Sequence, residues 1–225
     1  MNLNRTGRAG ALCWAAAAPV FLVASLVTGL RWRQPAYSWA THNISDLGNA
    51  YCGTWDTTRP RYVCSPWHPL MNAAILVTAV LLAAGLLLTW RLLGRGGVVR
   101  SAQGLLLLAT GGYALAALYP ADVNENLHVL GAFLIMGLGN VGLLLAGFAP
   151  GTTTLGRQRR LTLAAGLVAL VGTVLFFAQQ GSGIGVGGME RVAVLPFPLW
   201  ACCLGVLLAE TPAGQASRTR STVAN

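Results

Sequence analysis

The chain contains no lysine and only six acidic residues, and charged side chains make up 9% of its 225 residues. This scarcity of charge excludes an ordinary soluble domain, in which about a quarter of the residues are charged. The 15 basic residues are all arginines, and they stand in short groups beside apolar runs. The net charge of +9 would suggest a nucleic-acid partner in a soluble chain. Here the placement is typical of arginines that orient membrane helices, so we expect no nucleic-acid binding.

Several catalytic signatures are also missing. No HExxH or HxxxH pair of histidines occurs, which excludes the helical zinc motif of many metalloproteases. The glycine-rich stretch 181–188 lacks the Lys-Ser/Thr ending of a phosphate-binding P-loop. Its glycines instead predict close backbone packing or a flexible lid. The polar residues inside the apolar stretches are amides and hydroxyls rather than charges, which makes a small transporter the weakest functional hypothesis.

Apolar side chains dominate the composition, at 55% of the residues. A membrane-spanning helix needs about 20 mostly apolar residues. Stretches of this kind cover 11–30, 68–90, 101–119, 127–149, 161–180 and 191–209. The sequence therefore predicts an all-α, polytopic membrane protein that folds as a single bundle of six transmembrane helices.

The arginines predict how this bundle is oriented. Ten of them flank the chain termini and one set of helix ends, whereas five lie beside the other set. By the positive-inside rule the richer side is cytoplasmic. We therefore expect a multi-pass protein of the cell membrane, with a cytoplasmic N-terminus at 1–10 and a transmembrane domain at 11–210. The polar segment 211–225 is expected to be a disordered cytoplasmic tail, and the long connection 31–67 is expected to lie outside.

This outer loop holds two cysteines, Cys52 and Cys64. An oxidising compartment would permit a disulfide between them, whereas the other three cysteines fall within apolar stretches. We predict the disulfide, with two free thiols as the alternative because spacing does not establish the geometry. The many tryptophans and tyrosines of the loop predict that it folds against the membrane surface.

Most side chains able to do chemistry fall on the outer side, including all three histidines and five of the six acids. The segment His42-Asn43-Ile44-Ser45-Asp46-Leu47-Gly48 has the composition of a shaped turn. In one interpretation His42 is a base or metal ligand, Asp46 is its partner or a ligand-binding carboxylate, and Ser45 helps to bind a ligand. In the other interpretation the segment is an Asx-type turn that anchors the loop.

The second apolar stretch opens with Ser65 and Pro66, which predict an N-cap and a first helical position. This start places His68 and Asn72 on one face of the helix, four residues apart. His68 is a candidate catalytic residue or metal ligand. Asn72 is a candidate ligand-binding residue, although a polar side chain in an apolar span favours an interhelical hydrogen-bond anchor.

The fourth and sixth stretches also open with polar residues. Asp122 and Asn124 are expected to cap the fourth helix, with His128 one turn further in. Glu190 and Arg191 either pair with each other or supply charge to a site. We take Asp122, His128 and Glu190 as candidate catalytic residues, and Asn124 and Arg191 as candidate ligand-binding residues. Helix N-termini that face one cavity would attract an anion such as a lipid phosphate.

Four motifs carry a family resemblance: ISDLG, CSPWHPLMN, NENLHVLGA and GGMERVAVLPFPLW. Their order resembles the prokaryotic six-helix membrane proteins of the domain-of-unknown-function family 998, over about residues 10–210. This resemblance implies a six-helix fold and no established reaction. Through the ISD-G turn and the later H-x-x-G-A, the chain is more distantly similar to the eukaryotic Frag/DRAM/Sfk group, which includes a GPI-lipid remodelling factor and autophagy modulators. That similarity implies a lipid-facing role by analogy.

Three functions remain open. The first is an enzyme that performs hydrolysis or transfer on a lipid or lipid-linked substrate at the outer leaflet. Its histidines, His42, His68 and His128, would hold a metal such as Zn²⁺ or share acid/base work with the acids. The second is a non-catalytic membrane protein that binds or senses a lipid, or chaperones a partner, through the same outer cavity. The third is a small transporter.

Overall fold

The computed structural model describes residues 3–210 and contains six helical segments that are long and apolar enough to cross a membrane. The predicted all-α bundle of six helices is therefore confirmed, while the predicted tail at 211–225 lies outside the described residues. The six segments are α1 (Arg5–Arg31), α2 (His68–Leu93), α3 (Gly97–Leu118), α4 (Glu125–Ala132) continued by the π-helix η2 (Phe133–Gly139) and α5 (Asn140–Ala146), α7 (Arg159–Phe177), and α8 (Val186–Val194) followed by α9 (Pro196–Ala209).

Short elements fill some of the connections. Helix α6 (Thr154–Arg157) precedes α7, and the 3₁₀ helix η1 (Ser45–Gly48) lies in the long first loop. The same loop forms an antiparallel hairpin from β1 (Gly53–Trp55) and β2 (Arg61–Val63). This hairpin departs from the all-helical expectation, because strands of three residues carry too short an alternating pattern to be recognised in a sequence.

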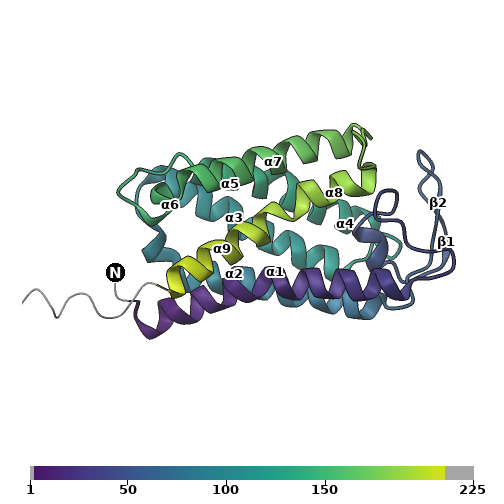
Figure 1. Ribbon diagram of the computed structural model, residues 1–225, viewed down its shortest axis with the longest axis horizontal. Coiled ribbons are helices and arrows are strands. Elements are labelled where there is room, and N and C mark those ends of the chain that lie inside the picture. The colour runs from purple at the N-terminus through teal and green to yellow at the C-terminus, as the bar shows by residue number, and fades with distance from the viewer. Residues whose placement is uncertain (1–2, 211–225) are drawn as a thin grey trace, which may run out of the picture.

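The helical segments lie lengthwise in one bundle (Figure 1), and their contacts follow the chain order around a closed ring. Helix α1 packs on α2, α2 on α3, α3 on the α4–η2–α5 segment, α5 on α7, and α7 on α8 and α9. Contact between α9 and α1 closes the ring. The start of α1 and the end of α9 lie at one end of the bundle, the terminal end; the long first loop and the starts of α4 and α8 lie at the other, the loop end.

Glycines allow the helix backbones to approach one another closely. A Cβ on Gly131 of α4 would lie 2.8 Å from the carbonyl oxygen of Gly112 in α3, and a Cβ on Gly112 would lie 2.6 Å from that of Gly131. Lipid tails provide no hydrophobic driving force between helices, so such close contact supplies much of the packing energy. Gly131 therefore makes room for the close approach of α3.

A buried amide links three segments in the interior of the bundle. Asn140 is 1% exposed, and its Nδ2 donates to the carbonyls of Ala169 and Ala193 and to the Thr173 hydroxyl, at 3.3, 2.9 and 2.9 Å. The Thr173 hydroxyl can donate its single proton to the carbonyl of Ala169, at 2.8 Å, or to that of Met136 in the π-helix, at 3.2 Å. A π-helix leaves backbone groups offset from the α-helical pattern, and the Met136 carbonyl thus lies within reach of this hydroxyl.

Candidate functional site

The candidate site begins at the turn η1, where Asp46 is 1% exposed. Its carboxylate accepts two hydrogen bonds from Arg61 of β2, each 2.6 Å long, and one from the backbone N–H of Asn43 at 2.8 Å. A bidentate pair of this kind compensates both charges and fixes their geometry. Asp46 therefore fastens the hairpin to the turn, which supports the anchoring interpretation of the motif.

The hairpin is closed by a disulfide between Cys52 and Cys64. Gly53 pairs with Val63 across the two strands, so the cysteines occupy the next opposed positions, with their Cα atoms 4.2 Å apart. The predicted disulfide is confirmed. It holds the base of the hairpin while the Asp46–Arg61 pair holds its side.

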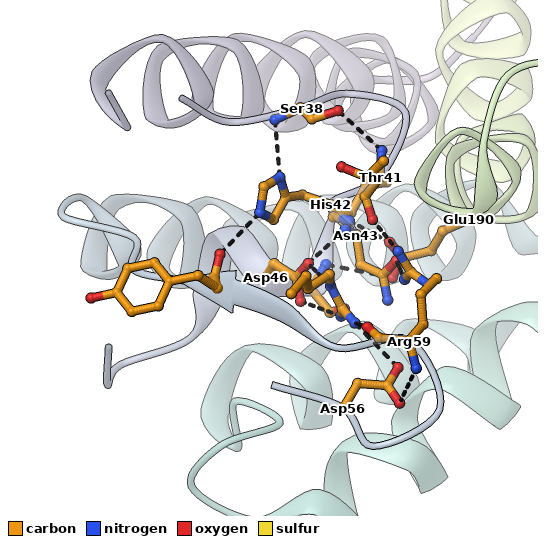
Figure 2. A network of polar contacts seen from close by, with 12 residues as sticks. Ser38, Thr41, His42, Asn43, Asp46, Asp56, Arg59 and Glu190 are labelled. Carbon is orange, nitrogen blue, oxygen red and sulfur yellow. Dashed lines mark hydrogen bonds and ion pairs between the residues drawn. The ribbon is translucent and has the colours of Figure 1, made fainter. Parts of the chain in front are cut away.

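Further polar contacts tie the hairpin tip to the loop (Figure 2). Arg59 donates to the carbonyl of Thr41 and, at 2.7 Å, to the side-chain oxygen of Asn43. Asp56 accepts from Thr58, from the backbone of Arg59 and from Arg61. Burial opposes the ionisation of Asp56, but these hydrogen bonds outweigh it and lower its pKa to about 2.

His42 has a partner on each ring nitrogen. Its Nδ1 accepts from the backbone N–H of Ser38 at 3.0 Å, so in the neutral ring Nε2 carries the proton and donates to the carbonyl of Tyr62 at 3.1 Å. The ring stacks on Tyr37 and lies against Trp32, with centroids 5.2 and 4.9 Å away. Both nitrogens are thus occupied, and His42 has the contacts of a structural residue.

Tyr37 connects this cluster to the last helical segment. Its hydroxyl donates to the carbonyl of Asn43 at 2.8 Å and accepts from Arg191. Burial raises the pKa of the Tyr37 phenol well above its usual range, against the opposing charge of Arg191. The phenol therefore stays neutral and keeps its donor.

Glu190 lies in α8 and is 5% exposed. Its carboxylate accepts from the backbone N–H of Ile44 and, at 3.4 Å, from that of Ser45. The carboxylate thus binds the first backbone donors of η1, across 146 residues of chain. The structure shows no ion pair between Glu190 and Arg191, so the two neighbours do not pair with each other as one expectation held.

Arg191 is held by neutral groups. Its Nη1 donates to the carbonyls of Trp39, His42 and Gly187 at 3.0, 3.1 and 2.6 Å, and its Nη2 donates to the Tyr37 hydroxyl. The guanidinium also lies over the Tyr37 and Trp39 rings, 5.6 and 5.2 Å from their centroids. Within residues 3–210 it forms no ion pair with a carboxylate, and the charge of the neighbouring Glu190 acts on it only at longer range.

The glycine-rich segment before α8 packs tightly on this loop. Gly187 donates its N–H to the carbonyl of Ala40 at 2.9 Å, and a Cβ on Gly187 would lie 2.1 Å from the carbonyl oxygen of His42. A Cβ on Gly185, whose φ is +81°, would lie 2.2 Å from the carbonyl oxygen of Ala40. The expectation of close backbone packing is confirmed at these two positions.

A small cavity lies behind the turn. Its volume is about 50 Å³, and its polar lining includes Ser45, His128 and Glu190. A water molecule needs roughly 10–15 Å³ of such volume, so the cavity has room for a few waters and is too small for a lipid head group. Of the predicted candidates, these three share one cavity.

His128 donates from Nδ1 to the carbonyl of Tyr119 at 3.0 Å, which makes Nε2 the basic atom of the neutral ring. The other polar residues at this helix start have separate tasks. Asn124 caps α4 by accepting from the N–H of Leu127 at 3.1 Å, as predicted. Asp122 accepts from the N–H of Tyr51 at 2.6 Å and so binds the first loop.

The start of α2 differs from its prediction. The helix begins at His68, beyond Pro66, and has no side-chain cap. The Ser65 hydroxyl donates instead to the carbonyl of Leu47 at 2.8 Å, and the helix begins too far along the chain for Ser65 to be its N-cap. His68 donates from Nδ1 to the Ser65 carbonyl at 3.1 Å.

Asn72 lies one turn into α2 and donates to the carbonyl of Gly48 at 2.9 Å. It therefore anchors the turn η1 to α2, where the sequence suggested an anchor between two helices. A Cβ on Gly48 would lie 2.4 Å from Asn72 Oδ1, so a larger residue there would displace the Asn72 side chain from this contact.

The three histidines do not form a metal site. Within residues 3–210, no three His, Cys, Asp or Glu side chains gather where they could hold a metal ion. The proposed zinc ligands His42, His68 and His128 come from three separate elements, and each ring is bound to nearby backbone. The three-histidine zinc site is therefore a wrong prediction.

An apolar groove of about 280 Å³ runs beside the cavity. It is lined by Phe21, Leu22, Ser25, Leu26, Trp39, Ile44, Arg191 and Leu195. Leu22 and Leu26 belong to a membrane-spanning segment and are 39% and 51% exposed, so this side of the groove faces lipid in a membrane. Phe21 and Ile44 line both the groove and the cavity and form the wall between them.

The sequence did not single out Arg61, Tyr37 or Trp39 as residues of the site. One signal pointed to Arg61: a buried carboxylate needs a cation, and the expected outer side has only five arginines to supply it. The roles of Tyr37 and Trp39 depend on contacts with Arg191 across more than 150 residues of chain, and no local pattern encodes such contacts.

Comparison with known proteins agrees with the motifs on which the site is built. No curated protein and no solved structure matches the chain. The family model described as Protein of unknown function (DUF998) matches residues 15–207, a range that includes all four motifs and the whole loop end. The chain therefore belongs to the DUF998 family.

Proposed function

We propose that the protein binds an anionic membrane lipid at its loop end, with an acyl chain in the groove and the head-group phosphate on Arg191. The observation that carries this proposal is a guanidinium that forms no ion pair within the described residues and lies at an apolar, lipid-facing groove. Arginine stays charged at physiological pH, and carbonyls and aromatic rings compensate that charge only in part. Two oxygens of a phosphate can accept two parallel N–H bonds from a guanidinium, and the phosphate supplies the missing negative charge.

The proposal includes an orientation. With both termini in the cytoplasm, as the arginine asymmetry favours, the loop end lies outside the cell membrane and the lipid comes from the outer leaflet. The disulfide supports this orientation, because disulfides persist in oxidising compartments.

Reporter fusions test the orientation. A fusion after Gly53 should read external, and one within 150–160 should read cytoplasmic. A cytoplasmic reading at Gly53 would place the groove in the inner leaflet and contradict this part of the proposal.

Native mass spectrometry tests lipid binding. The protein is reconstituted with equal amounts of phosphatidylglycerol and phosphatidylcholine, then released in neutral detergent. We expect the wild type to retain phosphatidylglycerol selectively. Arg191→Gln should lose at least about tenfold in this selectivity, since a lost charged hydrogen bond is worth about 1.5–3 kcal/mol.

Arg33→Gln is the matched control, because it removes an exposed arginine from the same end of the bundle; Arg33 does not line the groove. This control should retain phosphatidylglycerol like the wild type. Equal retention by Arg191→Gln and the wild type would contradict the proposal, as would an equal loss in both variants.

A second candidate function is acid/base hydrolysis of the bound lipid. It is favoured by the cavity, which places Glu190, His128 and Ser45 behind the wall that separates it from the groove. In this scheme the wall opens, and His128 Nε2 takes a proton from a cavity water as the water oxygen bonds to an ester carbonyl carbon of the lipid. The ester C–O bond then breaks and the leaving alcohol takes the proton from His128. Glu190 would stabilise the positive charge that the imidazole carries between the two proton transfers. His42 and Asp46 have no part in this scheme, because their polar atoms are engaged in the turn.

Product analysis tests the second candidate. Wild-type protein and Glu190→Gln are incubated in vesicles of phosphatidylglycerol and phosphatidylethanolamine, and lipids and water-soluble products are analysed by mass spectrometry. Catalysis predicts a new product with the wild type and none with Glu190→Gln. Retention of lipid without any product would favour binding alone.

A further inference from the structure

A second apolar groove lies between α1 and α2, which run side by side along the bundle (Figure 1). Its volume is about 560 Å³, twice that of the groove beside Arg191. Short apolar side chains line it: Pro19, Val20, Val23, Ala24, Val27, Leu70, Ala73, Ala74 and Val77. It shares no lining residue with the groove beside Arg191, so a ligand bound here is independent of the proposed lipid site.

The groove lies within one leaflet of a membrane. Both of its helices are membrane-spanning segments, and Val23 and Val77 in its walls are exposed. From Val27 to Pro19 it follows α1 for about 12 Å, at 1.5 Å per residue. The hydrocarbon core of a bilayer is about 30 Å thick, so the groove ends before the middle of the membrane. It therefore opens to the acyl chains of the leaflet at the loop end.

A cation lies at the loop end of this groove. Arg31 is the last residue of α1 and stands four residues beyond Val27, on the same face of the helix. Trp67 stands three residues before Leu70, and its carbonyl accepts from the Leu70 N–H at 3.0 Å. The Arg31 guanidinium lies over the Trp67 ring, 5.0 Å from its centroid. The two side chains thus meet where the groove reaches the membrane surface.

Charge complementarity indicates what the groove binds. Arg31 is exposed and forms no ion pair within the part of the chain that the structure describes. Arginine and tryptophan side chains are typical of the head-group level of a membrane, and a guanidinium can donate two parallel N–H bonds to a phosphate. A cation at the end of an apolar groove therefore complements both parts of a phospholipid, whereas a partner helix would need the groove alone.

We propose that the groove between α1 and α2 binds a glycerophospholipid, with one acyl chain along Val27 and Val23 and the phosphate on Arg31. Because Arg31 is exposed, water and salt screen its charge, so this groove should bind anionic and zwitterionic phospholipids about equally. Loss of Arg31 should then remove lipid of either kind from this groove and leave the selectivity for phosphatidylglycerol at Arg191 unchanged.

Photo-cross-linking tests the site, and the probe is a phosphatidylcholine that carries a diazirine in one acyl chain. The protein is reconstituted in phosphatidylcholine with a small share of the probe, then extracted and washed in neutral detergent. It is irradiated only after washing, so that retained lipid alone is labelled. We expect mass spectrometry to find the label concentrated in the segments 19–27 and 70–77.

Two variants should lower the labelling of these segments. Arg31→Gln removes a charged contact at the surface and should lower it by about threefold or more. Ala73→Phe should lower it further, because the added ring fills the groove at an exposed alanine. Both residues are exposed, so the variants should melt like the wild type, and this is checked first.

Arg33→Gln and Ala164→Phe are the matched controls, because both residues are exposed and neither lines the groove. They should be labelled like the wild type. The proposal is overturned if the wild-type label is spread evenly over the lipid-facing segments, or if Arg31→Gln and Ala73→Phe are labelled like the wild type. A dimer without label in the two segments would also overturn it, since a second copy would then cover the groove. Because the probe is zwitterionic, these outcomes are separate from the test of phosphatidylglycerol binding at Arg191.

Discussion

The charges of Asp46 and Arg191, which both bind the backbone of the segment 42–46, are compensated in different ways. Asp46 accepts from a guanidinium in bidentate geometry and from a backbone N–H. Arg191 binds carbonyls, a phenol and aromatic rings, but no carboxylate within residues 3–210. The first arrangement needs nothing further. In the second, the guanidinium beside the lipid-facing groove has no ion pair, and only the longer-range attraction of Glu190 opposes its charge. Under the proposed function, charge compensation rather than residue type distinguishes the structural Asp46 from the lipid-binding Arg191.

The largest effect is expected from breaking the compensated group. Arg61→Met leaves the Asp46 carboxylate buried without its cation, and removal of one partner of a buried pair costs about 3–5 kcal/mol of stability. Thermal unfolding in detergent and the yield of folded protein measure this loss.

Arg33→Met is the control for that experiment, because Arg33 is exposed and has no ion pair within the described residues. It should melt close to the wild type. If Arg61→Met melted as high as Arg33→Met, the Asp46–Arg61 pair would not be a structural anchor.

A somewhat smaller effect is expected in the membrane interior, where packing replaces charge as the stabilising factor. Gly131→Leu forces a side chain against the backbone of α3 and should cost stability toward the upper end of about 1–3 kcal/mol. Gly104→Leu is the matched control, since a Cβ there would contact nothing within 4 Å. Equal melting temperatures for the two variants would mean that α3 and α4 are not in close contact.

A third experiment sharpens the comparison at His42. His42→Leu leaves the Ser38 N–H and the Tyr62 carbonyl without their ring partner, which should cost about 1–2 kcal/mol. The amount of folded protein should fall, while the lipid retained per folded molecule stays close to that of the wild type. A normally stable His42→Leu protein that no longer retains lipid would assign His42 to the binding site.

The smallest effect is expected from the partly exposed Asp56. Because folding lowers its pKa to about 2, from a usual 3.8, ionised Asp56 contributes stability above about pH 4 and loses that contribution as the pH falls toward 2. Asp56→Asn should be less stable than the wild type by under about 1 kcal/mol at pH 5, and the difference should vanish near pH 2. A difference that grew on acidification would contradict this sign.

Much of the bundle could be predicted from the sequence because its determinants are local. Each span is an apolar run of sufficient length, Asn124 precedes a helix start, and Cys52 and Cys64 are only 12 residues apart in one polar loop. The prediction for the start of α2 was wrong because a tertiary contact, rather than a local one, decides the role of Ser65. The Ser65 hydroxyl finds a tertiary acceptor in the Leu47 carbonyl, which the local pattern of serine and proline does not reveal.

The sequence could predict at which end of the bundle the candidate site lies, but not which residues contact one another there. Because successive spans run in opposite directions, the polar residues were predicted to lie at one end of the bundle. Ser45, His128 and Glu190 do line one cavity there. Their partners depend on contacts such as that between Glu190 and Ile44, which are 146 residues apart. For that reason the sequence could suggest a three-histidine metal site, while the structure binds each ring to separate backbone groups.

The most direct test of the central claim is an experimental structure of the wild-type protein in nanodiscs that contain phosphatidylglycerol. The account predicts lipid density with an acyl chain between Phe21 and Leu195 and a phosphate within hydrogen-bond distance of the Arg191 guanidinium. A groove without lipid, or an Arg191 side chain paired with the Glu190 carboxylate, would contradict the claim that this arginine binds the phosphate of an anionic lipid.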